Sequence, residues 1–312
     1  MVQDSNTSPG ALGIAAVERF TGLTKDTLRI WERRYGFPTP GRDANGERIY
    51  STDQIERLRA IKRLMDVGHR PGKLMAMPLD ALADLAAAPP APAPEGEAAE
   101  FLAVLRAHDA ERLHAVLTEL LMRGGMGNFV MRVMPQLNEA VGNAWMRGEL
   151  AIFEEHLYSH HAQSVLRTAI TQMRPSGEGV RVLLTSLPDE PHTLGLLMAE
   201  ALFSIEGAFC IALGSETPAP EVAQAAIAHR ADIVALSFSA AYPAGTLFDA
   251  LEELRRLLPD GMELWAGGGG AMRPRKLPEG VVRAADFDEA VTLLRDRLGA
   301  RREQATVRRH DD

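Results

Sequence analysis

A glutamate and a histidine stand two residues apart in the segment S-L-P-D-E-P-H-T-L-G, as Glu190 and His192. The apolar run before them, Val180–Thr185, predicts a buried parallel strand, and Leu194–Ile205 after them has the apolar period of a helix. Open α/β sheets bind ligands at the carboxyl ends of their strands. Glu190 can accept from one ring nitrogen of His192, an arrangement expected of a metal ligand, and Gly195 lets a bulky group approach the backbone. The alternative is a solvated loop histidine.

Two further segments follow later strands of the same predicted sheet. Ser237-Phe-Ser239 follows the third strand, and the glycines Gly267, Gly268, Gly269 and Gly270 follow the fourth. The carboxyl ends of parallel strands meet at one edge, so these segments are expected to lie near His192. No G-x-G-x-x-G follows the first strand, which argues against a dinucleotide at the usual position.

A tryptophan precedes a Glu-His pair in a helical part of the chain. Trp145 is separated by nine residues from Glu155-His156. On spacing alone this indicates a buried tryptophan and a helix with surface polar residues. His156 and His160 are also four residues apart, as in some zinc sites, but no third ligand with a recognised spacing accompanies them.

Composition sets the class of protein. The chain has 312 residues, 46% of them hydrophobic, which is enough for two or three domains with substantial cores. A single cysteine, Cys210, excludes a disulfide within the chain and fits a reducing cytoplasm. We find neither a secretory signal nor a run of 18 apolar residues, so the expected location is cytoplasmic, with no membrane partner.

Charge is unevenly distributed. Residues 1–75 contain 13 Lys and Arg against 9 Asp and Glu, although the whole chain has a net charge of −8. A basic segment on an acidic protein indicates a local nucleic-acid surface.

The basic segment has the pattern of a winged helix-turn-helix. Ile14–Phe20 and Lys25–Tyr35 predict two short helices joined by a tight turn, Gly36–Tyr50 predicts a wing with a turn at Asn45–Gly46, and Ser51–Val67 predicts an amphipathic helix. The candidate DNA-contacting residues are Arg29, Arg33, Arg34, Tyr35, Arg42, Arg48 and Tyr50. We assign the first three arginines to the major groove or its phosphates, and Arg42, Arg48 and Tyr50 to the flanking backbone.

The rest of the chain divides into helical and alternating parts. Leu74–Leu85 predicts a weak helix. Further helices are predicted over Glu100–Leu121, Phe129–Trp145 and Leu150–Met173, with breaks at Gly124–Gly127 and Arg147–Gly148. Strands are predicted at Val180–Thr185, Ala208–Leu213, Asp232–Ser237, Met262–Ala266 and Val281–Ala284, and helices at Leu194–Ile205, Pro220–His229, Gly245–Leu257 and Asp288–Leu298. This alternation predicts a doubly wound parallel sheet.

The fold class is therefore multidomain, α plus α/β. We place a winged helix-turn-helix over residues 1–85, a Pro/Ala linker over 86–97, a four-helix bundle over 98–175, a Rossmann-like (flavodoxin-like) domain over 176–302 and a frayed tail over 303–312.

The first module resembles a known family of regulators. The residues T-G-L-T-K-D-T-L-R-I-W-E-R-R-Y-G-F-P-x-P-x-R-x-x-N-G-x-R-x-Y, from Thr21 to Tyr50, resemble the DNA-binding head of MerR-family transcription regulators. The resemblance implies binding to double-stranded operator DNA.

The last module resembles the cobalamin-binding domain of corrinoid proteins, whose pattern is D/E-x-H-x-x-G, then S-x-L/T, then G-G. The resemblance implies that His192 is the lower axial ligand of cobalt and that Glu190 orients it. Ser237, Ser239 and the glycines would line a slot for the displaced nucleotide tail. Two residues depart from the usual pattern: Glu190 stands where many enzymes have Asp, and Ser239 where Leu or Thr is usual.

The order of the modules resembles the CarH/LitR family of adenosylcobalamin-dependent, light-sensing repressors. In that family the residues matching Trp145, Glu155 and His156 cap the upper face of the corrin. The resemblance implies a homotetramer, a dimer of dimers, that binds DNA in the dark and releases it after light breaks the cobalt–carbon bond. It implies no enzyme and no catalytic residue.

One position bears on the light response. The best-defined family photoreceptors have histidine directly after this tryptophan, and here the residue is Met146. A thioether is a weaker ligand for cobalt than imidazole. The alternatives are that His156, His160, His161 or water takes its place, or that the light state is short-lived. A second interpretation is therefore a cobalamin- or redox-sensing MerR-type regulator without light output. A third is a corrinoid carrier or methyl-transfer module, and a fourth is a regulator that has lost the corrinoid.

Overall fold

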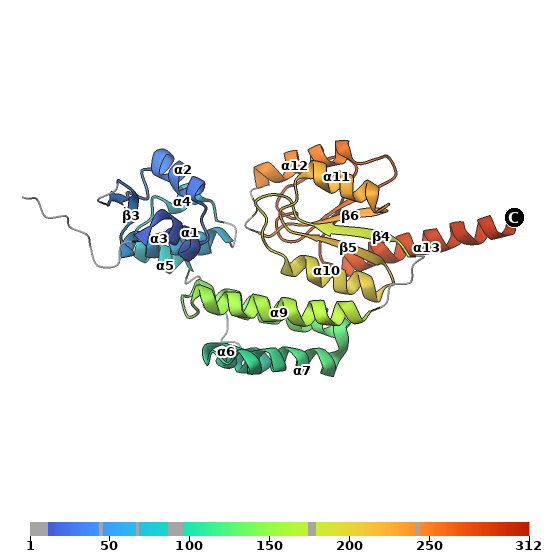
Figure 1. The fold of residues 1–312 in the computed structure, drawn as a ribbon, viewed down its shortest axis with the longest axis horizontal. Coiled ribbons are helices and arrows are strands. Elements are labelled where there is room, and N and C mark those ends of the chain that lie inside the picture. The colour runs from blue at the N-terminus through green and yellow to red at the C-terminus, as the bar shows by residue number, and fades with distance from the viewer. Residues whose placement is uncertain are drawn as a thin grey trace, which may run out of the picture. The chain divides into compact units, whose positions relative to one another are not determined.

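The structure is a computed structural model that describes residues 12–43, 46–66, 69–86, 96–173, 179–240, 242 and 244–311. The chain forms two compact units (Figure 1). The first comprises residues 1–94 together with 141–155, and the second residues 95–140 together with 156–312. The predicted bundle over 98–175 is divided between these units, with residues 141–155 in the first, and the predicted division into three modules stays a prediction.

The N-terminal segment has the predicted helix-turn-helix and wing. Helices α1 (Ile14–Thr21) and α2 (Lys25–Tyr35) follow one another across a tight turn, and β2 (Gly41–Arg42) pairs antiparallel with β3 (Arg48–Tyr50). Strand β1 (Leu12–Gly13), which was not predicted, adds to the other edge of β3. Asn45 of the predicted wing turn lies outside the described residues.

A single apolar core holds this segment together. Leu58, Ile61 and Leu64 of helix α3 (Thr52–Asp66) belong to the same buried core as Leu28 and Trp31, which lie on the inner face of α2 as predicted. The helix predicted over Leu74–Leu85 is wrong, because the structure has two short helices instead, α4 (Pro71–Leu74) and α5 (Leu79–Ala86). Pro78 lies directly before α5 and disfavours helical backbone at Met77, so a single helix cannot run through this position.

The middle of the chain is helical throughout. It contains α6 (Glu97–Arg106), α7 (Ala110–Asn128), the π-helical turn η1 (Phe129–Val133), α8 (Met134–Met146) and α9 (Ile152–Gln172). The single helix predicted over Glu100–Leu121 is wrong, since the chain turns at 107–109, where His108 has a positive φ of 58°. The predicted break at 124–127 is present as a kink at Gly125.

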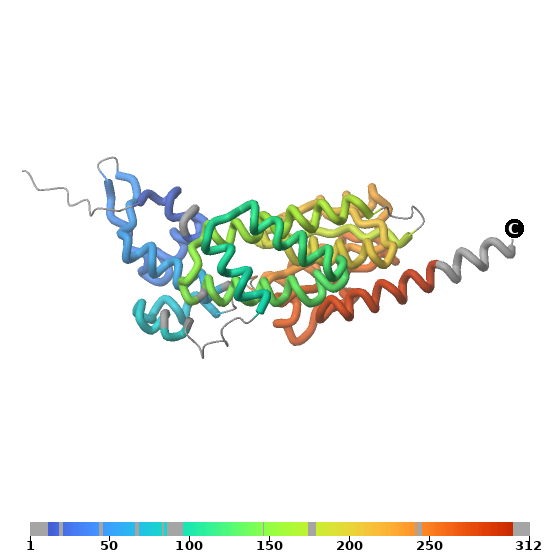
Figure 2. Tube along the Cα trace, turned by 90° about the horizontal axis from the view of Figure 1, so that it is seen from below, coloured from blue at the N-terminus to red at the C-terminus, as the bar shows by residue number. Residues whose placement is uncertain are grey.

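Helices α6, α7 and α9 run side by side within the second unit (Figure 2). The rings of Phe101 on α6 and Tyr158 on α9 meet edge to face, with centroids 5.5 Å apart. His114 of α7 and His161 of α9 make a second contact between facing helices, with ring nitrogens 3.4 Å apart. Residues 87–95, most of the predicted linker, lie outside the described part of the chain.

The C-terminal part is a five-stranded parallel sheet in the order β5-β4-β6-β7-β8. Its strands are β4 (Arg181–Thr185), β5 (Phe209–Gly214), β6 (Ile233–Ser237), β7 (Glu263–Gly267) and β8 (Val281–Ala284), each within one residue of its predicted bounds. This is the flavodoxin-like order, in which the strand order reverses between β4 and β6; a crevice at the carboxyl ends of these two strands is the usual ligand site of such sheets.

Helices cover both faces of the sheet (Figure 1). α11 (Ala219–Ala228) and α12 (Ala244–Leu257) pack on one face, and α10 (Leu194–Ile205) and α13 (Phe287–Asp311) on the other. The predicted end of the last helix at Leu298 is wrong, because the helix continues to Asp311 through Arg, Glu, Gln and Ala, which favour helix. Among the described residues, no helix is both long and apolar enough to cross a membrane.

Candidate functional site

Glu190 and His192 lie in the loop between β4 and α10, at the carboxyl edge of the sheet. Nδ1 of His192 is 2.5 Å from Oε1 of Glu190, which is the contact predicted from their spacing. The side chain of Glu190 is 1% exposed, whereas that of His192 is 52% exposed. The loop therefore buries the carboxylate and presents the imidazole at the surface of the unit.

The loop itself is braced by a buried serine. The hydroxyl of Ser186, directly after β4, donates to the carbonyl of Glu190 at 2.5 Å and accepts from the backbone N–H of Glu216 at 3.0 Å. Sequence reasoning missed this role, although a serine that directly follows a buried strand was a signal for it. Asp189 adopts a positive φ of 69°, which fixes the turn into Glu190.

The second oxygen of Glu190 reaches the neighbouring strand. Oε2 accepts the backbone N–H of Ser239, after β6, at 2.6 Å. Burial alone would raise the pKa of Glu190, but the hydrogen bonds from His192 and Ser239 outweigh it and hold the pKa below its usual value. An ionised carboxylate only accepts, so Nδ1 of His192 must donate. The neutral imidazole then carries its lone pair on Nε2, as a metal ligand requires.

The glycine-rich segment after β7 packs directly on the loop after β6. A Cβ at Gly268, which has a φ of 83°, would collide with the carbonyl oxygen of Phe238, and one at Gly270 would collide with that of Ser239. The N–H of Gly270 donates to the carbonyl of Phe238 at 2.9 Å. Only glycine permits this approach, so the segments expected to meet at the sheet edge do meet.

A cavity of about 350 Å³ opens beside these loops on the face covered by α10 and α13. Its wall includes five of the predicted residues, Gly195, Ser237, Gly267, Gly268 and Gly269. Gly195 faces Ser237, since a Cβ at position 195 would lie 3.1 Å from its hydroxyl oxygen. A volume of this size holds a small aromatic ligand.

Sequence reasoning missed several residues of the same wall. They include Ala199 and Phe203 of α10, Ala235 of β6, Trp265 of β7, Ala290 of α13 and Pro135 at the start of α8. The signal was the spacing of Gly195, Ala199 and Phe203, which repeats every four residues and therefore faces one side of the helix. Small side chains there leave room between α10 and the sheet.

Ser239 contributes its backbone rather than its side chain to the contact with Glu190. Its hydroxyl is buried and has no hydrogen-bond partner among the described residues. Ser239 does not line the cavity, and its predicted place in the slot is not supported by the structure.

The predicted capping residues lie on or beside α8 and α9. Trp145 and Glu155 belong to the first unit, and His156 to the second. Trp145 is half-buried, and the side chain of Met146 lies outside the described part of the structure. The described residues bring together no three His, Cys, Asp or Glu side chains able to hold a metal ion, so the zinc alternative for His156 and His160 gains no third ligand.

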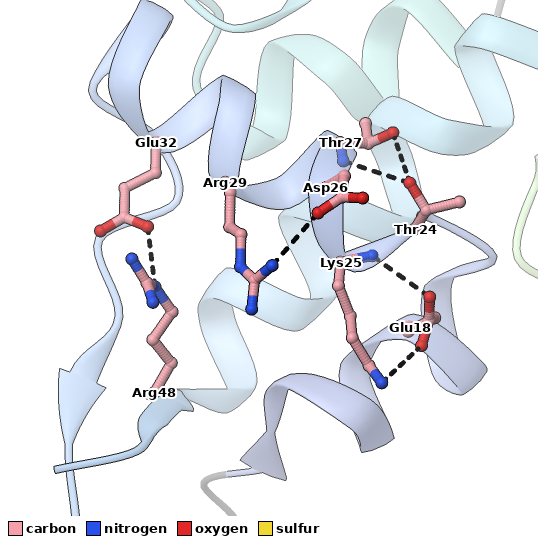
Figure 3. Close-up of polar contacts among 8 residues, drawn as sticks. All are labelled: Glu18, Thr24, Lys25, Asp26, Thr27, Arg29, Glu32 and Arg48. Atoms are coloured by element: carbon pink, nitrogen blue, oxygen red, sulfur yellow. Dashed lines mark hydrogen bonds and ion pairs between the residues drawn. The ribbon is translucent and has the colours of Figure 1, made fainter.

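A candidate nucleic-acid surface is formed by α2 and the wing (Figure 3). The hydroxyl of Thr24 caps α2 by accepting from the N–H of Thr27 at 3.1 Å, and Lys25 pairs with Glu18 of α1 at 3.5 Å. These contacts fix the start of α2 relative to α1. Arg33 and Arg34 lie in its last turn and are exposed.

Three of the remaining predicted contact residues are held by local partners. Arg29 pairs with Asp26 at 3.1 Å, while Arg48 of the wing pairs with Glu32 of α2 at 2.9 Å (Figure 3). Arg42 donates to the carbonyl of Gly46 across the wing at 2.8 Å. The pairing of Arg48 with Glu32 ties the wing to the helix, so both can approach one duplex together.

Tyr50 requires a correction. Its side chain is fully buried in the core of the first unit, so it cannot reach a DNA backbone in this structure. The alternation of β3 turns Tyr50 inward, and an aromatic ring is more stable there than in water. Tyr35 is partly buried against the same core, which leaves only part of its ring at the surface.

Comparison with known proteins agrees with this arrangement. Residues 12–76 match the MerR HTH family regulatory protein model. The chain is 32% identical to the HTH-type transcriptional repressor CarH of Myxococcus xanthus, over 83% of this chain and 89% of that protein. The chain belongs to the CarH family. A second relative, the repressor CarA of the same organism, is 31% identical over 83% of this chain and 87% of its own length.

This family member is therefore a MerR-type transcriptional regulator. Among solved structures, the monomethylamine corrinoid protein of Methanosarcina barkeri is similar over 63% of this chain and 96% of its own, with a TM-score of 0.49 and 14% identity. That likeness is too low to carry a functional argument.

Proposed function

We propose that this CarH-family regulator is a light-responsive repressor that binds adenosylcobalamin and, as a dark-state tetramer, operator DNA. One observation carries the proposal: Oε1 of the buried Glu190 lies 2.5 Å from Nδ1 of the half-exposed His192 at the edge of the sheet, the arrangement expected of an oriented metal ligand. The half-exposed imidazole is available to a large planar ligand, which a buried structural histidine would not be.

The residues present fit a cobalamin. His192 would ligate cobalt from below, and Glu190 would fix its ring. The displaced nucleotide tail needs a slot beside this histidine, and a cavity of about 350 Å³ lined by Ser237 and Gly267–Gly269 lies at the same sheet edge. Its wall is mainly apolar and includes two polar side chains, Ser237 and Asp286, which suits an aromatic base and a ribose.

Trp145, Glu155 and His156 are proposed to cover the upper face and the adenosyl group, and Met146 directly follows Trp145 in the sequence. When bound, adenosylcobalamin would supply a cobalt–carbon bond that light breaks. The loss of adenosyl would leave Trp145 without its packing partner, and the tetramer would lose the contacts that this packing supports. For the cofactor to promote assembly, it must bind the tetramer more tightly than the protomer.

DNA binding depends on assembly through multivalency. Each head presents Arg33 and Arg34 at the end of α2 and Arg42 on the wing, and phosphate contacts of this kind supply much of the affinity. Linked heads bind one operator with a high effective concentration, so dissociation into protomers would lower the apparent DNA affinity by about 10²-fold or more.

A second candidate is a cobalamin- or redox-sensing regulator without light output. Met146 favours it, because a thioether replaces the imidazole that would trap cobalt after photolysis. A corrinoid carrier is disfavoured by membership of a repressor family.

The deciding experiment is size-exclusion chromatography with absorbance detection, with adenosylcobalamin added in the dark and green light applied afterwards. A corrin-coloured tetramer that dissociates on illumination is the expected result. A corrin-coloured species whose elution volume does not change on illumination would favour the second candidate. A colourless protein peak would overturn both.

A further inference from the structure

Arg63, in the last turn of the head helix α3, reaches the end of the helix that carries Trp145. Its Nη1 donates to the carbonyl of Trp145 at 3.3 Å, and its guanidinium carbon lies 6.0 Å from the centre of the indole ring. Both residues belong to the first compact unit, although 82 positions separate them. The contact links the DNA-binding fold to the proposed sensor residue.

This contact caps α8. The carbonyl of Trp145 also accepts the N–H of Gly148 at 3.0 Å, and the N–H of Glu149 donates to the carbonyl of Ala144 at 2.9 Å. These two bonds form the helix C-terminus in which a glycine, here Gly148, takes the left-handed conformation. A cation at this end meets the negative pole of the helix dipole. Arg63 is therefore a cap supplied from another element.

Glycine at position 148 makes room for the cap. It has a φ of 74°, and a Cβ there would lie 3.2 Å from Nη1 of Arg63. Thus two separate features, the closed turn and the missing side chain, accommodate the same guanidinium. Among the described residues Arg63 forms no ion pair, and burial, followed by the charge of Arg59, lowers its pKa.

The helix that carries Arg63 shares a buried core with the DNA-contacting helix α2. Leu64 and Ile61, beside Arg63 on α3, belong to the fully buried core that also contains Leu28 of α2. Packed cores transmit displacements because they have little free volume. A shift of Arg63 would therefore act on the orientation of α2.

We propose that Arg63 is a positioning residue that couples the state of Trp145 to the head, so that rearrangement around Trp145 changes DNA affinity through α3. This rests on the proposed function, in which the upper face of the cofactor packs on Trp145. The proposal adds to the control of DNA binding by tetramer assembly, because it gives each protomer its own connection between Trp145 and the DNA-binding head.

The first arm of the test uses the full-length protein without cofactor. Hydrogen exchange at the amides of Arg147, Gly148 and Glu149 is compared in wild type, Arg63→Ala, Arg63→Lys and the control Arg59→Ala, which removes the same charge one turn earlier. We expect at least about fivefold faster exchange in Arg63→Ala, partial rescue by lysine and no change in the control. Unchanged exchange in Arg63→Ala would overturn the cap, whatever the cofactor.

The second arm measures operator affinity with and without adenosylcobalamin in the dark. We expect Arg63→Ala to reduce the ratio of the two affinities by about fivefold or more, while the cofactor spectrum and the affinity for cofactor stay those of wild type. If exchange rises but the ratio is unchanged, Arg63 is only a structural cap and the coupling is refuted. If the wild-type ratio is one, the proposed function itself fails, and the coupling with it.

Discussion

Nδ1 of His192 lies 2.5 Å from Oε1 of Glu190, and the carboxylate is almost completely buried while the ring is half exposed. Glu190→Gln keeps the shape but cannot accept from both His192 and the backbone of Ser239. We expect a loss of about 1–3 kcal/mol in the free energy of unfolding. Cobalamin affinity should fall by about 10–100-fold. Urea denaturation and cofactor titration measure the two effects.

Asp189→Asn is the matched control for Glu190→Gln. It neutralises the adjacent carboxylate, which is exposed and has the positive φ that asparagine tolerates. Stability and cofactor affinity should both remain within error of wild type. Equal losses in the two variants would attribute the effect to net charge rather than to the hydrogen bonds.

His192→Ala tests ligation through the spectrum of the bound corrin. The removal of the ring should lower the free energy of unfolding by about 1–3 kcal/mol, because Oε1 of the buried Glu190 then keeps only the backbone N–H of residue 192. Cobalamin should bind weakly or keep its own base on cobalt. The absorption spectrum of the bound corrin reports this difference. His229→Ala, which removes an exposed histidine of the same unit, should leave the spectrum unchanged. An unchanged spectrum in His192→Ala would remove His192 from the coordination of cobalt.

Ala199→Leu tests whether the cavity receives part of the ligand. The larger side chain would extend from α10 into the space of about 350 Å³ without entering the filled core. We expect stability without cofactor to be retained or raised, since cavities cost stability, and cobalamin affinity to fall by about tenfold or more. Wild-type affinity in a well-folded variant would place the nucleotide tail elsewhere.

Tyr50→Phe checks the corrected role of this tyrosine. Its hydroxyl is buried with no hydrogen-bond partner among the described residues, and burial raises the pKa of the phenol. Removing the hydroxyl should leave stability unchanged or raise it by about 1 kcal/mol. Operator affinity, measured by fluorescence anisotropy, should not change. A clear loss of affinity in a stable variant would restore Tyr50 as a DNA contact.

Cys210 is expected to resist alkylation in the native protein. Burial raises the pKa of its thiol to about 12, and only the thiolate reacts. At pH 8 iodoacetamide should modify it more than about a hundredfold more slowly than in urea. The native rate should continue to rise above pH 10. A plateau near pH 9 would indicate an ordinary, accessible thiol.

The sheet domain was predictable because each of its strands is a short apolar run bounded by turn residues, and this short length together with the flanking residues distinguishes such runs from helices. The contact of His192 with Glu190 was also predictable, because two side chains that stand two residues apart in a loop have few relative arrangements. The helix predicted over Glu100–Leu121 failed because the apolar spacing continues across the turn at His108, whose left-handed backbone has no strong sequence signal.

The residues of the cavity wall and the burial of Tyr50 were harder to predict for a different reason. Ala199, Ala235 and Ala290 contribute by being small, and only the assembled helices and strands show that their small size leaves a shared space. Tyr50 follows basic residues in a DNA-binding segment, but the pleat of β3 decided its orientation. Both depend on tertiary contacts that single-sequence patterns do not contain.

The donor that Ser239 offers to Glu190 is its backbone N–H. Every amino acid except proline supplies that group, so this hydrogen bond does not depend on which side chain stands at position 239. The departure from the usual Leu or Thr therefore leaves the contact between the two loops intact. Natural variation at 239 is free to tune the packing around Phe238 and Gly270 without loosening Glu190, and proline is the one residue that relatives with this glutamate should lack.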